Sequence, residues 1–285
     1  MKLLTLNTHS LQEENARQKL EWFVEGILKE RPDIVALQEV SQTASAPLAE
    51  DHLREGQYRI AAQISLRQDN YAAQVAFRLR QAGIDCHWVW LPIKRGYETY
   101  DEGIAILSLG RKITKAEMYP VSKSEDYDNW RTRAVLGVQV EGYSDWFYSI
   151  HLGWWEDAED PFLEQWKTLG DRLETQRRQS TVWLMGDFNA PDIFLDQSYT
   201  RIRADGWMDT HQAAEQKGKD FTVFGIIDGW RDKLPDQNVS GMRLDYIWCS
   251  QEKEIRSSRI LFDGENEPVV SDHFGVLIET KEERK

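Results

Sequence analysis

The sequence predicts an α/β protein in which packed β-sheets carry helices on their outer faces. Two observations lead to this prediction. The chain opens with a strand, helix and strand pattern, and from residue 86 onward short runs rich in β-branched and aromatic residues dominate. Many strands with few helices are typical of a sandwich of sheets.

The opening segment contains two strands and one helix. Residues 2–6 (KLLTL) and 33–40 (DIVALQEV) predict buried strands. Between them, apolar residues recur at helical spacing from Ala16 to Leu28. We expect this helix to stop before Pro32, because proline lacks a backbone N–H and restricts the residue before it. The opening therefore predicts a βαβ unit.

Later in the chain, strand-forming runs alternate with turn signals. We expect strands at residues 86–92, 103–109, 133–140, 145–152, 181–188, 243–250 and 274–280. Apolar residues at helical spacing predict two more helices, around residues 71–82 and 159–177. The polar segments 41–58, 120–130 and 229–242 are interpreted as loops rather than linkers, because strand patterns resume directly after each.

Length and charge narrow the class of protein. A chain of 285 residues has room for a sizeable core, and residues 1–285 are expected to form one domain. The net charge of −13 disfavours unaided binding to DNA, RNA or anionic membranes. No run approaches the roughly 18 apolar residues of a membrane span, and the opening residues lack a secretory apolar region. With only Cys86 and Cys249, the protein is expected in a reducing cytoplasm.

Polar residues suited to chemistry follow several of the predicted strands directly. They are Asn7 after KLLTL, Glu39 after DIVALQ, His151 after WFYSI, and Asp187 with Asn189 after TVWLMG. A strand that leaves an apolar interior and ends in such a group delivers it to the rim of the scaffold, where ligands bind. We therefore expect these side chains to converge at one site.

Three further residues extend this set, namely Asp245 in RLDYIW and the pair Asp272 and His273 in SDHFGV. Carboxylate and amide oxygens suit a hard cation such as magnesium. Histidines can donate to phosphate oxygens whose charge grows in the transition state, and Asp245 can orient one of them. Together the residues predict metal-assisted phosphoester hydrolysis. Taken singly, each has an ordinary alternative, such as a capping carboxylate at Glu39 or an Asx-type turn in GDFNAP.

Six motifs in order over residues 4–276 closely resemble those of the endonuclease/exonuclease/phosphatase superfamily with its DNase I-like fold. They are LNTH, QEV, HLG, GDFNAP, RLDYIW and SDHFGV. The resemblance implies a four-layered α/β sandwich, with two central, mainly antiparallel sheets flanked by helices. It also implies a Mg²⁺ or Mn²⁺ site at one rim. Glu39 would then be the principal metal ligand, with Asn7 beside it and Asp272 near the metal.

The same resemblance assigns the catalytic groups. Asp187 would orient or deprotonate the attacking water, and Asn189 would hold that water and the phosphate. His151 would stabilise the charge on phosphorus or assist the leaving oxygen. His273 would contact the scissile phosphate and be oriented by Asp245. The division of acid and base roles within this group stays open.

One position departs from the family pattern. Family members often have an acidic residue two positions after the first asparagine, but this chain has His9 there. The departure puts the metal shell of the first motif in doubt. A plain loop residue is an equally good interpretation of His9.

The substrate must be inferred from the rest of the chain, because the superfamily includes nucleases, sphingomyelinases and sugar phosphatases. An acidic chain without a basic stripe argues against a nuclease, although the local pairs Arg131 with Arg133 and Arg177 with Arg178 keep that alternative open. A secreted sphingomyelinase would need an export signal and an apolar protrusion, and neither is evident.

Several segments favour a sugar phosphate. Four segments resemble the maltose 6'-phosphate phosphatase branch, which is cytoplasmic. They are HLGWWEDAEDPFLEQW, LNTHS, YDEGIAILS and NWRTRAV. Trp154 and Trp155 follow His151, so at least one indole is expected to line the cleft and pack on a sugar. Arg131 and Arg133, two apart on a predicted strand, would face one side and clamp a phosphate dianion, or form an exposed charged face.

The leading hypothesis is a monomeric, cytoplasmic, metal-dependent phosphatase that hydrolyses a phosphorylated sugar, with maltose 6'-phosphate as the expected substrate and no membrane or nucleic-acid partner. The first alternative is a phosphodiesterase of the same superfamily that acts on nucleic acid or on a sphingomyelin-like head group. The second is a non-catalytic binding module that has kept the fold.

Overall fold

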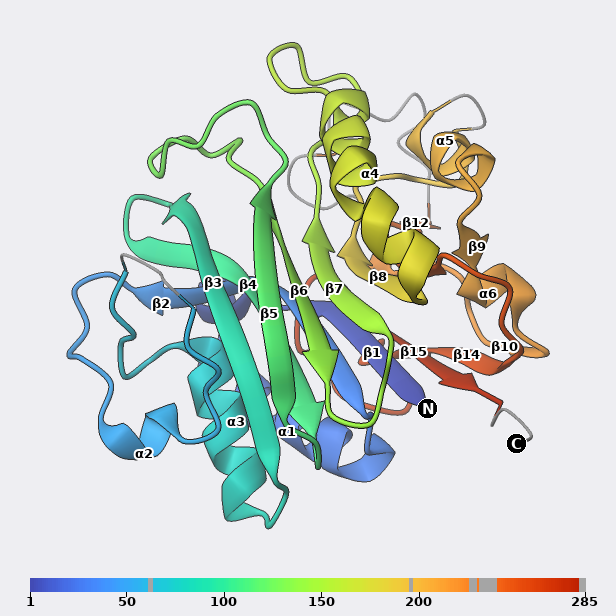
Figure 1. The fold of residues 1–285 in the computed structure, drawn as a ribbon. Helices are drawn as coiled ribbons and strands as arrows, with labels where there is room; N and C mark the ends of the chain where they lie inside the picture. Colours follow the sequence, from blue (N-terminus) through green and yellow to red (C-terminus); the bar gives the residue numbers. More distant parts are fainter. Residues whose placement is uncertain (61–63, 195–196, 226–229, 231–239, 282–285) are drawn as a thin grey trace.

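The computed structural model describes residues 1–60, 64–194, 197–225, 230 and 240–281, and Figure 1 shows the fold. The helices are α1 (Ala16–Glu30), α2 (Asp51–Arg54), α3 (Tyr71–Gln81), α4 (Phe162–Gln179), α5 (Ser198–Ala204) and α6 (Thr210–Ala213), with a 3₁₀ turn η1 (Ser10–Gln12). The strands are β1 (Lys2–Asn7), β2 (Ile34–Thr43), β3 (Cys86–Gly96), β4 (Tyr100–Leu109), β5 (Ile113–Pro120), β6 (Ala134–Val140), β7 (Trp146–His151), β8 (Val182–Asp187), β9 (Met208–Asp209), β10 (Gln216–Lys217), β11 (Val223–Phe224), β12 (Gly241–Met242), β13 (Asp245–Cys249), β14 (Ile255–Leu261) and β15 (Gly275–Thr280).

These strands form two large sheets and one small one within the described residues. The first large sheet has the order β10-β14-β15-β1-β2-β4-β3, the second has the order β5-β6-β7-β8-β13-β9, and β11 pairs with β12. Most neighbours are antiparallel, and the parallel pairs are β1 with β2, β7 with β8, and β10 with β14. The prediction of mainly antiparallel sheets is therefore confirmed.

Successive residues of the central strands face different cores, as the period of two in a strand requires. Leu3 and Ile34 point into the core between the two large sheets, which also contains Val138 and Met185 from the second sheet. The next residues along the same strands, Leu4 and Val35, belong instead to the core beneath α1 and α3. The first sheet is thus covered on both faces.

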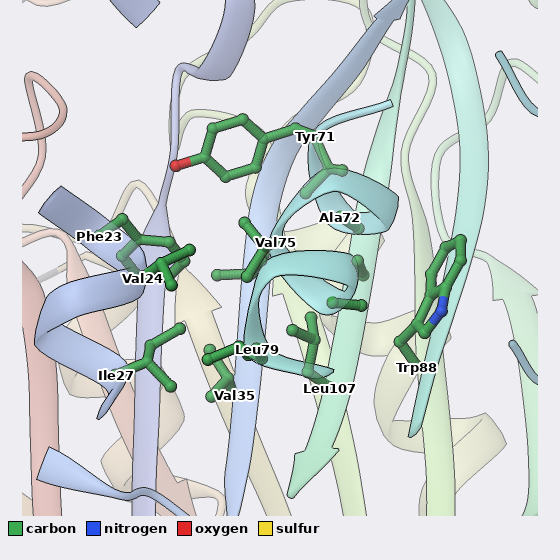
Figure 2. Close-up of a cluster of buried hydrophobic side chains, with 14 of the residues drawn as sticks. Phe23, Val24, Ile27, Val35, Tyr71, Ala72, Val75, Leu79, Trp88 and Leu107 are labelled. Atoms are coloured by element: carbon green, nitrogen blue, oxygen red, sulfur yellow. The ribbon is translucent and has the colours of Figure 1, made fainter. Parts of the chain in front are cut away.

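Helices close the two outer faces of the sandwich. Figure 2 shows Phe23 and Ile27 of α1 packed with Val75 of α3 over the first sheet, where they meet Leu107. On the far side of the molecule, α4 packs residues such as Trp166 against the second sheet. The result is a helix, sheet, sheet and helix arrangement, which confirms the four-layered α/β sandwich. Among the described residues, no helix is both long and apolar enough to cross a bilayer.

Each strand and helix predicted from the sequence is present, with ends shifted by a few residues. The loop predicted for 41–58 is wrong in part, because β2 continues to Thr43 and α2 forms within it. Two long strands, β5 and β14, and the two-residue strands β9 to β12 were not predicted. β5 is an edge strand whose outer residues are exposed, and β14 alternates apolar with polar residues, so neither shows a strongly apolar run. Of the predicted loop 229–242, only residues 230 and 240–242 are described, and two of these form β12.

A parallel pair of strands at the centre of each large sheet, β1 with β2 and β7 with β8, determines where the predicted site residues lie. Because β1 and β2 run the same way, their carboxyl ends reach the same edge, and Asn7 pairs in register with the residue before Glu39. In the other sheet, His151 of β7 lies opposite Asp187 of β8, and Asp187 lies opposite Asp245 of β13. The sandwich therefore brings the ends of these strands to one rim.

Gly186, directly before Asp187, lets β8 approach the backbone of β7 closely. It has φ of 149°, and a Cβ there would lie 2.0 Å from the carbonyl oxygen of Ile150 in the neighbouring strand. We expect Gly186→Ala to lower the free energy of unfolding by about 3 kcal/mol or more, measured by urea denaturation, because backbone must move.

Gly170 provides the matched control for this substitution. It lies within α4, and a Cβ there would meet nothing within 4 Å. Gly170→Ala is therefore expected to raise the free energy of unfolding by about 0.5–1 kcal/mol, since alanine is the better helix former. A Gly186→Ala protein as stable as the Gly170→Ala protein would contradict the assigned close approach.

Candidate active site

A cavity of about 420 Å³ opens at the rim where β1, β2, β7 and β8 end. Figure 1 shows the long loops before β6 and after β7 projecting beyond this end of the sheets. Six of the residues predicted for the metal and catalytic groups line the cavity: Glu39, His151, Asp187, Asn189, Asp272 and His273. Asn7 and Asp245 lie directly behind them, fully buried. The convergence expected from the strand ends is therefore present.

Asn7 links the two carboxylates at the centre of the site. Its side-chain Nδ2 donates to Oε1 of Glu39 at 2.9 Å and to Oδ2 of Asp187 at 3.1 Å. Its Oδ1 accepts the backbone N–H of His9 at 3.3 Å. In this arrangement Asn7 orients both carboxylates through its amide nitrogen, and its role as a metal ligand stays a prediction.

Glu39 points into the cavity because the strand that carries it is irregular. The register of β2 against β4 shifts between Leu37 and Val40, and Glu39 has φ of 52° in the left-handed region. A bulge of this kind turns a side chain out of the regular alternation, and a non-glycine residue in this region costs energy that the surroundings must offset. Strain at this position is consistent with a functional role for the carboxylate.

The pKa values of the two histidines shift in opposite directions. Burial works against a charged ring at His273, but Asp245 lies 2.8 Å from its Nδ1 and, with Asp187, outweighs burial and holds the pKa of His273 well above its usual range. Burial, together with the nearby charges of Arg133 and Lys94, holds the pKa of His151 well below its usual range. The site therefore combines an imidazolium at His273 with a neutral imidazole at His151.

Asp187 is the acidic group between these rings. Its Oδ2 lies 3.7 Å from Nε2 of His151 and 3.9 Å from Nε2 of His273. Burial raises the pKa of Asp187 to about 7, although His273 acts in the opposite direction. A carboxyl group with a pKa near neutrality is suited to accept a proton from water.

Asn189 holds the loop after β8 in place. Its backbone N–H donates to Oδ1 of Asp187 at 2.8 Å, as in an Asx-type turn. Its side-chain Nδ2 donates to the carbonyl of Leu152 at 3.0 Å, and its Oδ1 accepts the indole N–H of Trp230 at 3.2 Å. The turn interpretation and the functional interpretation of GDFNAP are thus both compatible with the structure.

The donor set fits a hard divalent cation. Glu39, Asp187 and Asp272 all face the cavity. Burial raises the pKa of Glu39, and repulsion from Glu102 and Asp272 adds to this effect. A divalent cation would relieve that repulsion through oxygen ligands of the kind magnesium prefers.

His9 forms an ion pair beside the carboxylates rather than being a plain loop residue. Its Nδ1 lies 2.9 Å from Glu13 Oε1 and 3.9 Å from Asp272 Oδ1. Burial opposes its charge, but the hydrogen bond with Glu13 and the charge of Asp272 raise the pKa of His9 to about 9. His9 therefore places positive charge next to Asp272, where the family pattern often has an acidic residue.

The predicted clamp of Arg131 and Arg133 on one strand face is wrong. Both residues precede β6, and Arg131 lies in a turn. The Nε of Arg131 lies 3.0 Å from Asp157, and one of its terminal nitrogens lies 3.3 Å from Glu159. Arg131 is thus neutralised by carboxylates, although both arginines line the cavity.

The two tryptophans predicted to bind substrate differ in position. Trp154 lines the cavity, which confirms that at least one indole reaches it. Trp155 is not among the lining residues and packs against Phe162, with ring centroids 6.0 Å apart, at the edge of the core beneath α4. Trp155 therefore does not line the cavity, and Trp154 is the indole that meets the expectation.

Sequence reasoning missed part of the cavity wall. Lys94, Tyr97 and Trp130 line it, with Tyr97 65% and Trp130 57% exposed. They come from β3, the β3–β4 turn and the loop before β6. The sequence carries no motif at these positions, and an exposed aromatic residue beside a glycine or asparagine is too weak a signal to identify them.

The fold and the convergent carboxylates and histidines are those of a superfamily of metal-dependent phosphoesterases. The sequence model of the Endonuclease/Exonuclease/phosphatase family matches residues 4–273, so the chain belongs to this family. Its members are hydrolytic, mostly phosphoesterases, and generally use a divalent metal. A direct comparison with curated proteins finds no match.

Solved structures share the fold over nearly the whole chain. An endonuclease/exonuclease/phosphatase family protein from Leptotrichia buccalis C-1013-b is 27% identical, with a TM-score of 0.84 over 99% of this chain and 100% of that one. A mannosyl-6-phosphatase from Bacteroides thetaiotaomicron is 16% identical, with a TM-score of 0.66 over 99% and 100%. TDP2 from Caenorhabditis elegans is 16% identical, with a TM-score of 0.63 over 99% and 74%.

Proposed function

We propose that this protein is a metal-dependent phosphomonoesterase that hydrolyses a phosphorylated sugar, with maltose 6'-phosphate as the expected substrate. The observation that carries the proposal is the composition of one cavity. Its floor holds Glu39, Asp187, His151 and His273, while Trp154 lies on its wall. Groups for phosphoester chemistry and an aromatic surface for a sugar thus line the same cavity.

In the proposed reaction, water attacks phosphorus directly and no covalent phosphoenzyme forms. Asp187 accepts a proton from the water, which the loop held by Asn189 helps to position. The imidazolium of His273, fixed by Asp245, donates to a phosphoryl oxygen on which negative charge grows. His151, opposite Asp187 on β7, contacts the same phosphoryl group. As the water oxygen bonds to phosphorus, the bond from phosphorus to the sugar oxygen breaks, and the sugar leaves as an alcohol that takes its proton from solvent.

The metal is proposed to be Mg²⁺ or Mn²⁺. Glu39 would be its main ligand, with Asp272 close by and Asn7 orienting Glu39. When bound, such a cation neutralises charge on the phosphoryl oxygens and polarises the ester. Asp187, Asp245 and His273 present possible ligand atoms within 4.8 Å of one another, but His273 and Asp245 already bind each other, which favours Glu39.

The surroundings of the cavity support a sugar as the leaving group. Trp130 and Tyr97 stand at its rim, and Asp157 and Gln165 add hydrogen-bonding groups to the wall. Flat aromatic faces and nearby hydrogen-bonding groups are what a sugar ring requires. The similarity to a protein described as a mannosyl-6-phosphatase agrees with this proposal. We further propose that the protein acts as a cytoplasmic monomer without membrane or nucleic-acid partners.

A phosphodiesterase remains the second candidate function, because TDP2 shares the fold. A substrate screen separates the two. We expect hydrolysis of maltose 6'-phosphate and other hexose phosphates with Mg²⁺, and loss of phosphate release with a chelator. Faster cleavage of an oligonucleotide or of sphingomyelin under the same conditions would contradict the sugar proposal.

The third hypothesis, a non-catalytic binding module, predicts no turnover. It is disfavoured because the carboxylates and imidazoles are not only retained but also mutually positioned. Inactivity toward every phosphoester in the screen with Mg²⁺, Mn²⁺ and other divalent metals would revive it.

A further inference from the structure

A partly buried lysine and a buried arginine share one wall of the cavity. Nζ of Lys94, on β3, donates to the carbonyl oxygen of Trp130 at 3.2 Å. Nη1 of Arg133, just before β6, donates to the same oxygen at 2.8 Å. Like charges repel strongly in a partly desolvated environment, so an arrangement that brings them to one carbonyl requires nearby negative charge.

The described residues supply only part of that negative charge. Lys94 lies 3.1 Å from Glu102, and its side chain is 12% exposed. Arg133 is 8% exposed and has no carboxylate partner among the residues that the structure describes. Its Nε is buried without a hydrogen bond in the same set of residues. Arg133 is therefore the positive charge of this wall that has no carboxylate partner among the described residues, and Glu39, which also attracts Lys94, is the proposed metal ligand.

This charge faces the reacting groups. Lys94, Arg133 and His151 line the same cavity, and the two cations contribute to the lowered pKa of His151. Burial and the proximity of Arg133 also lower the pKa of Lys94. Arg131 differs, because Asp157 and Glu159 already neutralise it.

We propose that Lys94 and Arg133 form a receptor for the second negative charge of a phosphoryl dianion and thereby select phosphomonoesters over phosphodiesters. The inference deepens the proposed function and rests on its assignment of the phosphoryl group to the floor beside His151. A monoester can carry two negative charges on its terminal oxygens, whereas a diester carries one. Arginine and lysine are suited to bind the additional charge through charge-assisted hydrogen bonds.

The pair Lys94 and Arg133 thus explains a distinction that the metal and catalytic residues do not make. Water can attack either kind of ester at this site, because both present non-bridging phosphoryl oxygens to the same groups, namely Glu39, Asp187, His151 and His273. In a diester the third oxygen is bonded to carbon and carries no charge. The uncharged substituent on this oxygen would then lie against both cations. The cost of leaving those cations without an anion falls on the diester alone.

Binding of two non-hydrolysable ligands tests the proposal without relying on turnover. The ligands are phenylphosphonate and its monomethyl ester, which share the phenyl group and differ by one charge in mildly alkaline buffer. Calorimetric titrations of the full-length, Mg²⁺-supplemented protein give the preference for the dianion. The metal and His273 also favour the dianion, so the informative quantity is the change in preference between variants.

We expect Arg133→Met and Lys94→Met each to reduce the preference for the dianion by about 30-fold while affinity for the ester changes by less than about threefold. Arg133→Lys keeps the charge and is expected to retain most of the preference. Arg178→Met, which removes an exposed arginine of α4, is the matched control and leaves the preference unchanged.

An unchanged preference in both methionine variants would overturn the inference. Equal weakening of both ligands would overturn it as well, because it would show general damage to the cavity. Since phenylphosphonate has no second anionic group, a change in its binding assigns the cations to the phosphoryl group itself. Turnover of 4-nitrophenyl phosphate by the unaltered protein is measured separately, so an inactive protein that binds the dianion contradicts the proposed function and not the anion site.

Discussion

Asp187→Ala is expected to reduce turnover of a sugar phosphate by about a hundredfold or more, because it removes the group placed to accept a proton from the attacking water. The carboxylate lies 3.7 Å from the imidazole of His151 and 3.9 Å from that of His273, and its Oδ1 also fixes the loop through the backbone of Asn189. Initial rates of phosphate release at saturating substrate and Mg²⁺ measure the effect.

The fold is expected to persist in this variant, since a raised pKa shows that the charged carboxylate is held at a cost in free energy. Circular dichroism and the thermal unfolding midpoint check this. Asp171→Ala, at an exposed position of α4, is the matched control with unchanged rates. An Asp187→Ala protein with full activity would refute the role assigned to Asp187.

The positions of the proposed catalytic groups could be predicted because they depend on strand periodicity. Asn7, His151 and Asp187 follow apolar runs that fill the sandwich, so each must appear where its strand leaves the core. Asp245 could be placed too, because β13 pairs antiparallel with β8 and begins opposite Asp187. These positions follow from backbone geometry that hydrophobic patterning makes visible.

The substrate wall could not be predicted in the same way. Arg131 and Arg133 looked like neighbours on a strand face, but the turn before β6 separates them and carboxylates on the β7–α4 loop neutralise one. Arg133 instead shares a hydrogen-bond acceptor, the carbonyl oxygen of Trp130, with Lys94, which lies 39 positions earlier in the chain on β3. Such a pairing depends on which loops meet above the sheets, and no local periodicity encodes it.

Irregular backbone also limited the prediction at Glu39. The sequence places it after an apolar strand, but β2 continues through it to Thr43. The side chain reaches the cavity through a bulge and a left-handed φ, rather than because the strand ends there. The sequence selected a residue that does line the cavity, but for the wrong structural reason, since a bulge in a continuous strand has no clear sequence signature without glycine.

Glu39→Gln is expected to weaken binding of Mg²⁺ or Mn²⁺ by more than about a hundredfold and to lower turnover by a similar factor, because substitutions of residues that merely support a metal ligand already cost 10–100-fold. The glutamine keeps the shape of the side chain and removes the charge on which a hard cation depends. Calorimetric titration of Mn²⁺ into the protein measures affinity independently of activity.

The thermal unfolding midpoint of Glu39→Gln is a second measurement, and without metal it is expected not to fall although metal affinity does. Burial, together with repulsion from Glu102 and Asp272, raises the pKa of Glu39, so the charged carboxylate is unfavourable in the metal-free protein. Removing its charge should leave the metal-free unfolding midpoint unchanged or higher, while the increase in midpoint on adding Mg²⁺ disappears. Glu141→Gln, at an exposed position, serves as the control that keeps the increase. If Glu39→Gln instead lowered the metal-free midpoint and retained metal affinity, Glu39 would be a structural carboxylate and the ion would have to be held by other ligands.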